Sequence, residues 1–140
     1  MITRSFEEEL LSSGRLVCPN WGTSMLPLIR QGKDLMVIIP RPNRRLRKYE
    51  AVFFRRGESY LLHRILKVND GEYLIGADNR TNTEIVKDDQ IIGVLYSVLR
   101  DGSREVKAKG LACRGYVFFW YILRPKLRKV KQVIKKMLGR

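Results

Sequence analysis

The sequence predicts a mostly β domain of about seven short strands, with a short helix at its N-terminal end and a basic amphipathic helix at its C-terminal end. Aliphatic or aromatic runs recur at hairpin spacing between residues 15 and 107, and turn sequences such as Asn69-Asp70-Gly71 separate them. The apolar pattern changes to helical spacing only near the C-terminal end. With 140 residues and 44% hydrophobic content, the chain is long enough to form one core.

The N-terminal helix is predicted over residues 5–13, because Ser5 and Glu8 form a capping box and Gly14 is a natural stop. The acidic run that begins this segment also suits the positive end of a helix. The strands are expected over the following ranges: 15–18, 34–39, 51–55, 59–68, 72–75, 90–99 and 103–107.

Two regions are predicted from the change of character along the chain: a β domain over residues 1–110, and an aromatic segment with a basic amphipathic helix over residues 111–140. The helix itself is expected from residue 124 onward, with Pro125 in its first turn. Residues 124–140 contain eight basic side chains and no acidic one. The apolar stripe of this helix packs on the β domain or on a second subunit, or it lies on an anionic membrane surface.

The net charge is +14, which favours a polyanionic partner, namely nucleic acid, an anionic membrane or an acidic peptide. Nucleic acid is the less favoured of these, because the basic loop over residues 41–48 contains no interleaved aromatic residues. Cys18 and Cys113 have no metal-ligand spacing, so no metal or cofactor is expected, while one disulfide between them stays open. The sequence shows neither an export signal nor a membrane-spanning segment, which predicts a cytoplasmic protein or one held peripherally at a membrane face.

Three polar residues are candidates for a catalytic site. Ser24 follows Gly22 and precedes Pro27, so its hydroxyl can be held in one direction, although a plain polar loop has the same composition. The single histidine, His63, lies in an apolar strand, where a core role is the commoner one. Asp78 follows the strand over residues 72–75, and all three side chains can converge on one sheet edge. A serine, a base and a carboxylate form a chemically complete set for acyl transfer.

At these places the sequence resembles the type I signal peptidase family, which shares a coiled β-sheet barrel with the self-cleaving domain of SOS-response repressors. The segment from Gly22 to Pro27 is similar to the family's nucleophile box, Ser-x-Met-x-Pro. His63-Arg64 stands where bacterial members carry Lys-Arg, and residues 77–83, Ala-Asp-Asn-Arg-Thr-Asn-Thr, are similar to the box Gly-Asp-Asn-Arg-Asp-Asn-Ser.

The resemblance implies that Ser24 is the nucleophile, that its backbone N–H contributes to an oxyanion hole, and that His63 is the base. It also implies roles for five further residues. These are Asp78 as the carboxylate partner of His63, Arg64 and Asn79 as supporting residues, and Met25 and Pro27 in substrate binding. Gly22 lacks the hydroxyl that some members use at that position, Ala77 replaces a glycine, and the usual anchor and accessory insertion are not seen.

The predicted function is therefore a serine endopeptidase that cleaves a precursor, leader or signal peptide bound as an extended strand. The alternative is a non-catalytic basic protein that binds nucleic acid or an anionic membrane on a degenerate peptidase fold. Self-cleavage with Lys67 as the base is the weaker third reading. It requires a shifted strand register, and the chain contains no Ala-Gly bond.

Overall fold

The computed structural model describes residues 5–139 of the chain. Residues 1–4, which belong to the segment considered above for an export signal, lie outside the described residues, as does Arg140 at the end of the predicted basic helix. The chain forms two compact units, one that ends at Ala108 and one that begins at Lys109. Within residues 5–139, no helix combines the length and apolar character needed to cross a membrane.

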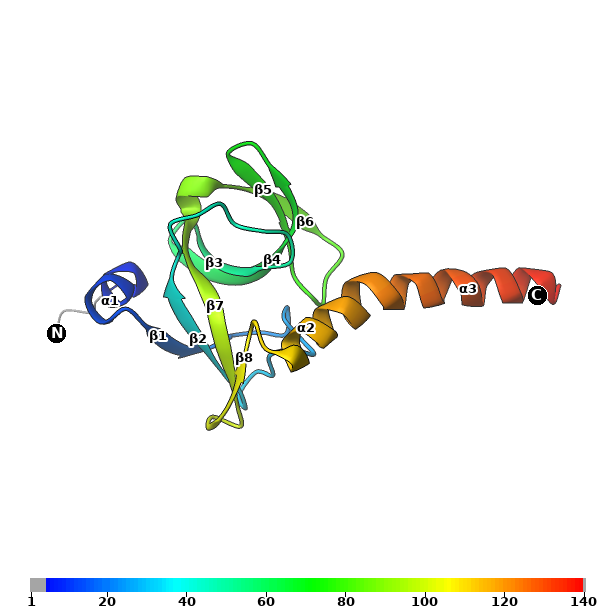
Figure 1. Ribbon diagram of the computed structural model, residues 1–140, viewed down its shortest axis with the longest axis horizontal. Coiled ribbons are helices and arrows are strands. Elements are labelled where there is room, and N and C mark those ends of the chain that lie inside the picture. Colours follow the sequence, from blue (N-terminus) through cyan, green and yellow to red (C-terminus); the bar gives the residue numbers. More distant parts are fainter. Residues whose placement is uncertain (1–4, 140) are drawn as a thin grey trace. The chain divides into compact units, whose positions relative to one another are not determined.

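The first unit is a strongly coiled antiparallel sheet of eight strands, preceded by helix α1 (Phe6–Ser13) (Figure 1). A short 3₁₀ turn over Asp88–Gln90 precedes β7. The strands are β1 (Leu16–Pro19), β2 (Leu35–Pro40), β3 (Ala51–Arg56), β4 (Ser59–Asn69), β5 (Glu72–Gly76), β6 (Thr83–Lys87), β7 (Ile91–Arg100) and β8 (Arg104–Lys107).

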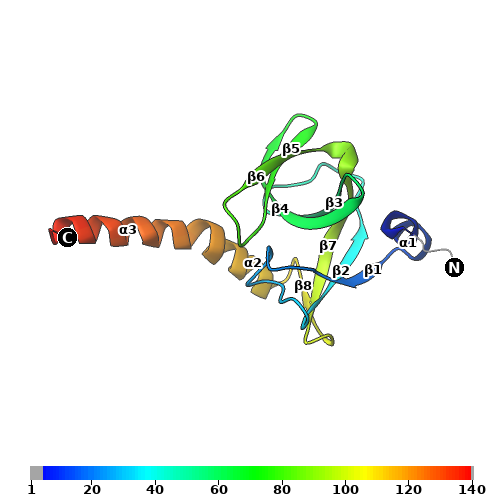
Figure 2. The ribbon, with the colours of Figure 1, turned by 180° about the vertical axis from the view of Figure 1, so that it is seen from behind.

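The strands follow the spatial order β1-β2-β7-β3-β4-β5-β6, and β8 pairs with β7. Figure 2 shows the consecutive strands β4, β5 and β6 from behind. Because β1 and β6 are the two ends of this order, the ladder of hydrogen bonds does not close among the described residues. The predicted mostly β architecture with its two flanking helical segments is thus confirmed, whereas closure into a barrel is not found.

All seven predicted strands are present, and their bounds differ from the predicted ones by at most one residue. The Asn69–Glu72 pair closes a hairpin around Asp70-Gly71, as the turn sequence predicts. One strand, β6, was not predicted, because the polar run that precedes it reads as a continuous turn. In β6, exposed and covered side chains alternate, and only Val86 is buried.

Helix α1 is capped as predicted and is held against the sheet. The Ser5 Oγ accepts a hydrogen bond of 3.2 Å from the Glu8 N–H, and Gly14 ends the helix in the left-handed conformation at φ 71°. The Phe6 ring lies 5.8 Å from that of Phe53 on β3. The Phe6 ring also lies 5.3 Å from that of Tyr60 on β4, so these ring contacts hold α1 against β3 and β4.

The hydrophobic core lies on the concave side of the coiled sheet, where buried side chains of β3, β4, β5, β6 and β7 meet. Gly93 on β7 is required where β2 crosses closely. A Cβ atom at this position would lie 2.6 Å from Ile38 Cγ2 and 2.7 Å from the backbone oxygen of Ile39. Glycine therefore sets the distance between two central strands.

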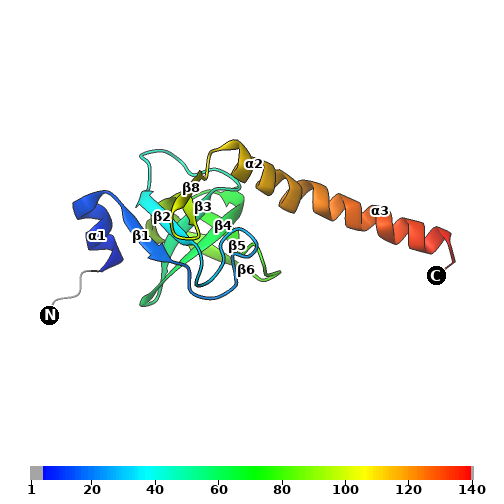
Figure 3. The same cartoon turned by 90° about the horizontal axis from the view of Figure 1, so that it is seen from below.

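The second unit is helical along most of its length (Figure 3). It consists of α2 (Leu111–Val117), a π-helical segment over Phe118–Leu123, and α3 (Arg124–Met137). The sequence predicted a helix from residue 124 only, and the structure extends helical backbone back to Leu111. Aromatic and β-branched residues, which usually favour strands, concealed this earlier part of the helix.

We predict that Gly93→Ala destabilises the first unit by about 2 kcal/mol, because the new methyl group overlaps a backbone oxygen that has little freedom to move. Urea unfolding monitored by circular dichroism would measure the loss. Gly115→Ala is the control. Gly115 lies in α2 with open space around it, so alanine there should be neutral or slightly stabilising. Equal stability of the Gly93→Ala variant and the wild type would contradict the prediction.

Candidate active site

Ser24 lies in an irregular loop that connects β1 to β2. The loop is anchored by the side chains of Met25, Leu28 and Ile29, which are buried, and by a hydrogen bond of 3.0 Å from the Ile29 N–H to the Met25 carbonyl. Gly22 adopts a φ of 94°, which a glycine reaches without strain. Ser24 is half-buried and Pro27 is exposed. Met25, predicted to contact substrate, is in this structure a core anchor of the loop.

The end of the same loop is held by the buried carboxylate of Asp34. Its oxygens accept three hydrogen bonds from Arg30, one of 2.9 Å from Arg100 and one of 3.1 Å from the Asp101 N–H. Hydrogen bonds from Arg30 are the largest of the effects that keep the pKa of Asp34 well below its usual range. The carboxylate thus ties the loop to β2 and to the turn between β7 and β8.

His63 lies in the middle of β4, opposite Val52 on β3. Its ring packs edge-on against Phe54, with the ring centroids 5.8 Å apart, and only 12% of its side chain is exposed. Burial lowers the pKa of His63 below 6.5, an effect that nearby Glu84 partly opposes. Because a general base must be unprotonated, a lowered pKa suits His63 for this role at neutral pH.

Arg64, the residue after His63, forms a buried ion pair with Asp78. Two hydrogen bonds of 2.9 and 3.0 Å join the guanidinium to both carboxylate oxygens. A third guanidinium hydrogen bond, of 2.9 Å, goes to the Tyr49 carbonyl. The side chains of Arg64 and Asp78 are 5% and 0% exposed, so the two charges compensate each other away from water. The pair connects β4 to the loop after β5.

The loop after β5 also contacts the serine loop directly. The Asn79 N–H donates a hydrogen bond of 2.8 Å to the Ser24 carbonyl, and the Asn79 Nδ2 donates one of 3.2 Å to the Thr23 carbonyl. Arg80 donates a hydrogen bond of 2.9 Å to the Thr23 hydroxyl. The three segments that carry Ser24, His63 and Asp78 are therefore joined in one place by hydrogen bonds.

The arrangement differs from a fully assembled triad in two respects. Within residues 5–139, no hydrogen bond joins the Ser24 hydroxyl to His63. The carboxylate beside the His63 Nδ1 is that of Glu84, with 3.9 Å between Nδ1 and Oε1, which is beyond hydrogen-bond distance. Catalytic hydrogen bonds are often long in free enzymes and shorten when substrate binds. Asp78 nevertheless acts on His63 through its charge, which raises the pKa of the imidazole.

Two donors in the segment over residues 20–24 are unused within the described part of the chain. The Ser24 N–H makes no hydrogen bond to another of residues 5–139, which leaves it available to an external acceptor. Asn20 is buried, and its Nδ2 has no hydrogen-bond partner among the described residues. An unpaired buried donor costs about 1–3 kcal/mol, and a ligand carbonyl would compensate this cost.

Sequence reasoning gave no role to four residues. Three of them lie around His63 or the serine loop, and the fourth, Asn20, directly follows β1. Glu84 was missed because its strand was not predicted. Arg56, which forms an ion pair with Glu84, directly follows the strand predicted over residues 51–55 and received no role. Arg80 stood inside the similar box but received no role. Asn20 gave no signal at all, since one asparagine before a turn is common.

Cys18 and Cys113 are both buried and are not joined in a disulfide, and burial raises the pKa of the Cys18 thiol to about 11. Among residues 5–139, no group of three or more histidine, cysteine or acidic side chains is arranged to hold a metal ion.

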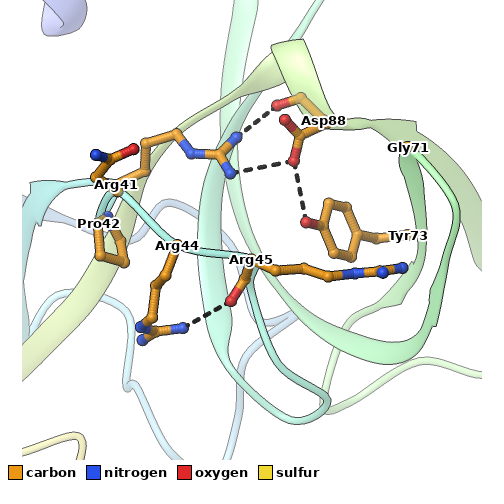
Figure 4. Close-up of a pocket in the computed structure, with 8 residues that line it drawn as sticks. Arg41, Pro42, Arg44, Arg45, Gly71, Tyr73 and Asp88 are labelled. Carbon is orange, nitrogen blue, oxygen red and sulfur yellow. Dashed lines mark hydrogen bonds and ion pairs between the residues drawn. The ribbon is translucent and has the colours of Figure 1, made fainter.

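A hollow lined by none of the candidate catalytic residues lies beside the basic loop over 41–48 (Figure 4). It is an open depression of about 590 Å³. Arg41 donates hydrogen bonds to the Asp88 carbonyl and carboxylate, at 2.7 and 3.1 Å, and Arg44 forms an ion pair with Glu50. These two arginines hold the loop on the sheet, so much of its positive charge is neutralised locally.

Comparison of the chain with models of known protein families gave no match, and comparison with curated proteins gave no significant match.

We predict that Asp34→Asn destabilises the first unit by about 3 kcal/mol near neutral pH, because it removes a buried charge from two arginines. The pKa of Asp34 is lower in the folded than in the unfolded chain. Its contribution is therefore complete above about pH 4 and is lost as the pH falls through the folded-state value.

Urea unfolding of both proteins at several pH values would measure this difference. Asp70→Asn is the matched control, since Asp70 is fully exposed and the new Asn-Gly turn keeps its hairpin preference. A difference between wild type and Asp34→Asn that stays constant down to strongly acidic pH would contradict the prediction.

Proposed function

We propose that the protein is a serine endopeptidase of the signal-peptidase-like class, with Ser24 as the nucleophile and His63 as the general base. The observation that carries this proposal is the joining of the three motif segments by hydrogen bonds from Asn79 and Arg80 to the serine loop and by the Arg64–Asp78 pair. A structural role alone does not require a half-buried serine, a histidine with a lowered pKa and a buried carboxylate on segments that hydrogen bonds join.

In the proposed reaction, the Ser24 hydroxyl oxygen attacks the carbonyl carbon of a peptide bond, and its proton passes to His63. Since the His63 Nδ1 faces Glu84, the Nε2 is the nitrogen left for this transfer. The protonated imidazole then gives its proton to the leaving amine as the C–N bond breaks. Water, deprotonated by His63, hydrolyses the resulting ester and restores the serine.

The charge that develops on the carbonyl oxygen during attack would be stabilised by the Ser24 N–H, which is not used within the described residues. Asp78 would stabilise the imidazolium through its negative charge, while Arg64 holds the Asp78 carboxylate in position. Strand β1 leads into the serine loop and is an end of the sheet, so its outer edge suits an extended peptide.

The alternative, a non-catalytic basic protein, has one observation in its favour. Residues 1–108 carry 18 basic against 14 acidic side chains, a net charge of +4, whereas residues 109–140 carry ten basic and no acidic side chain, +10. Most of the positive charge therefore lies outside the unit with the candidate site, and binding to a polyanion does not require the Ser24 segment.

We predict that a serine-reactive acylating probe, such as a β-lactone, adds one label to the wild-type protein, detected as a mass shift of the intact chain. Ser24→Ala should abolish the label, because the acceptor oxygen is gone. His63→Gln, which keeps a polar side chain of similar size but no base, should slow labelling by at least about a hundredfold.

Ser103→Ala is the matched control, because Ser103 is exposed in the turn before β8 and should leave labelling unchanged. Circular dichroism would show that each variant is folded. An unlabelled wild type in its folded state would overturn the peptidase proposal in favour of the alternative, and so would a label that survives in Ser24→Ala.

We also predict the pH dependence of the labelling rate. The rate should rise with pH along one acidic limb whose midpoint lies below 6.5, because burial lowers the pKa of His63 and only the neutral imidazole accepts the proton. Glu84→Gln should move the midpoint to lower pH, since Glu84 raises this pKa. Arg56→Gln should move it to higher pH, since Arg56 lowers it.

The two variants serve as controls for each other, because a general disturbance of β4 would move both midpoints in one direction. Shifts of equal sign, or a midpoint above 6.5 in the wild type, would contradict His63 as the titrating base.

A further inference from the structure

Helix α3 and the residues that flank it expose a continuous apolar face. In an α-helix each residue advances by about 100°, so positions can be placed around the axis. Seven apolar side chains fall within an arc of about 140°, and each is between 38% and 80% exposed. They are Leu123, Leu127, Val130, Val133, Ile134, Met137 and Leu138. An exposed apolar surface of this extent marks an interaction site.

The opposite side of the helix is strongly basic. Of the seven basic residues of α3, six lie outside the apolar arc, and Lys126 lies near its border, where a long side chain can extend toward water. No acidic residue occurs anywhere between residues 109 and 140. The helix therefore lacks the ion pairs that usually stabilise a solvent-exposed helix.

Aromatic side chains continue the surface toward the N-terminal end of the unit. The Trp120 and Tyr116 rings stack with their centroids 5.9 Å apart, and the Arg124 guanidinium lies 3.6 Å from the centre of the Trp120 ring. Phe118 and Phe119 are both largely exposed. Tryptophan, tyrosine and arginine are the side chains that favour the interface between lipid headgroups and acyl chains.

Charge decides among the partners that could cover this face. A second copy would bring together two units that each carry +10, and the resulting repulsion opposes the contact. Nucleic acid would neutralise the basic side but would leave the apolar side in water. An anionic lipid surface satisfies both sides at once, since acyl chains cover the apolar residues and headgroups neutralise the basic ones.

We propose that residues 116–138 form an in-plane membrane helix that holds the protein on an anionic lipid surface. The polar–apolar boundary lies along the length of the helix, so the helix lies parallel to the membrane and does not cross it. This inference is independent of Ser24, and its test gives a readout other than labelling by an acylating probe.

The test uses the full chain with the substitution Trp21→Phe, which leaves Trp120 as the single tryptophan. Binding is measured by sedimentation with phosphatidylcholine vesicles that contain either no phosphatidylserine or about 30% of it. Brominated acyl chains reveal whether Trp120 enters the membrane. We expect binding to the anionic vesicles, quenching of Trp120, and at least about tenfold weaker binding to the neutral vesicles.

Two pairs of variants separate the contributions of the two faces. The double variant with Val130→Ser and Ile134→Ser changes only the apolar arc. It should bind vesicles at least about tenfold more weakly, although its charge is unchanged. Lys129→Gln with Lys136→Gln should weaken binding to anionic vesicles about fivefold for each residue. Gln132→Ser, on the basic side, is the control and should leave binding unchanged.

The proposal is overturned by any of three results. These are equal binding to neutral and anionic vesicles, absence of binding by a chain whose helix content is intact, and binding without quenching of Trp120. Sedimentation equilibrium without lipid would reveal a second copy on the apolar face. A dimer that dissociates in the Val130→Ser, Ile134→Ser variant and does not bind vesicles would replace the membrane with that partner.

Discussion

The position of the serine loop depends on one buried carboxylate. Asp34 accepts hydrogen bonds from two arginines and a backbone N–H, and these donors come from the loop itself and from the β7–β8 turn. Such a carboxylate fixes three segments of chain at one point. Its hydrogen bonds are directional, whereas the surrounding apolar contacts are not. Ser24 is thus displayed on a loop that is tied at its end by Asp34 and near its start by Asn79.

The local elements of the β unit were largely predictable because their signals are short-range. The capping box at Ser5 and the Asn-Asp-Gly hairpin each specify backbone geometry through residues adjacent in sequence. Strand β6 was missed because most of its side chains remain in water, so it has little apolar periodicity. The helical backbone between Leu111 and Leu123 was missed because its aromatic residues and Gly115 favour other structures when considered alone.

The sequence singled out candidate catalytic residues, but it did not indicate which side chains lie next to them. The residues Ser24, His63 and Asp78 stood out through their chemistry and through resemblance to one family. The pairing of Asp78 with Arg64, and the position of Glu84 beside His63, depend on which strands become neighbours and on which way each side chain points. That information is long-range, and neither composition nor spacing contains it.

The open ends of the sheet have a consequence for how the protein behaves at high concentration. An unpaired strand edge is a template for further strands, and exposed edges promote aggregation. Strand β1 has only four residues and ends in Pro19, which has no N–H to donate, while β6 carries charged Glu84 and Lys87 among its five residues. Strand β1 is short and ends in a proline, and β6 is short and charged, so neither end readily propagates a fibre and the sheet can remain open without the protection that closure provides.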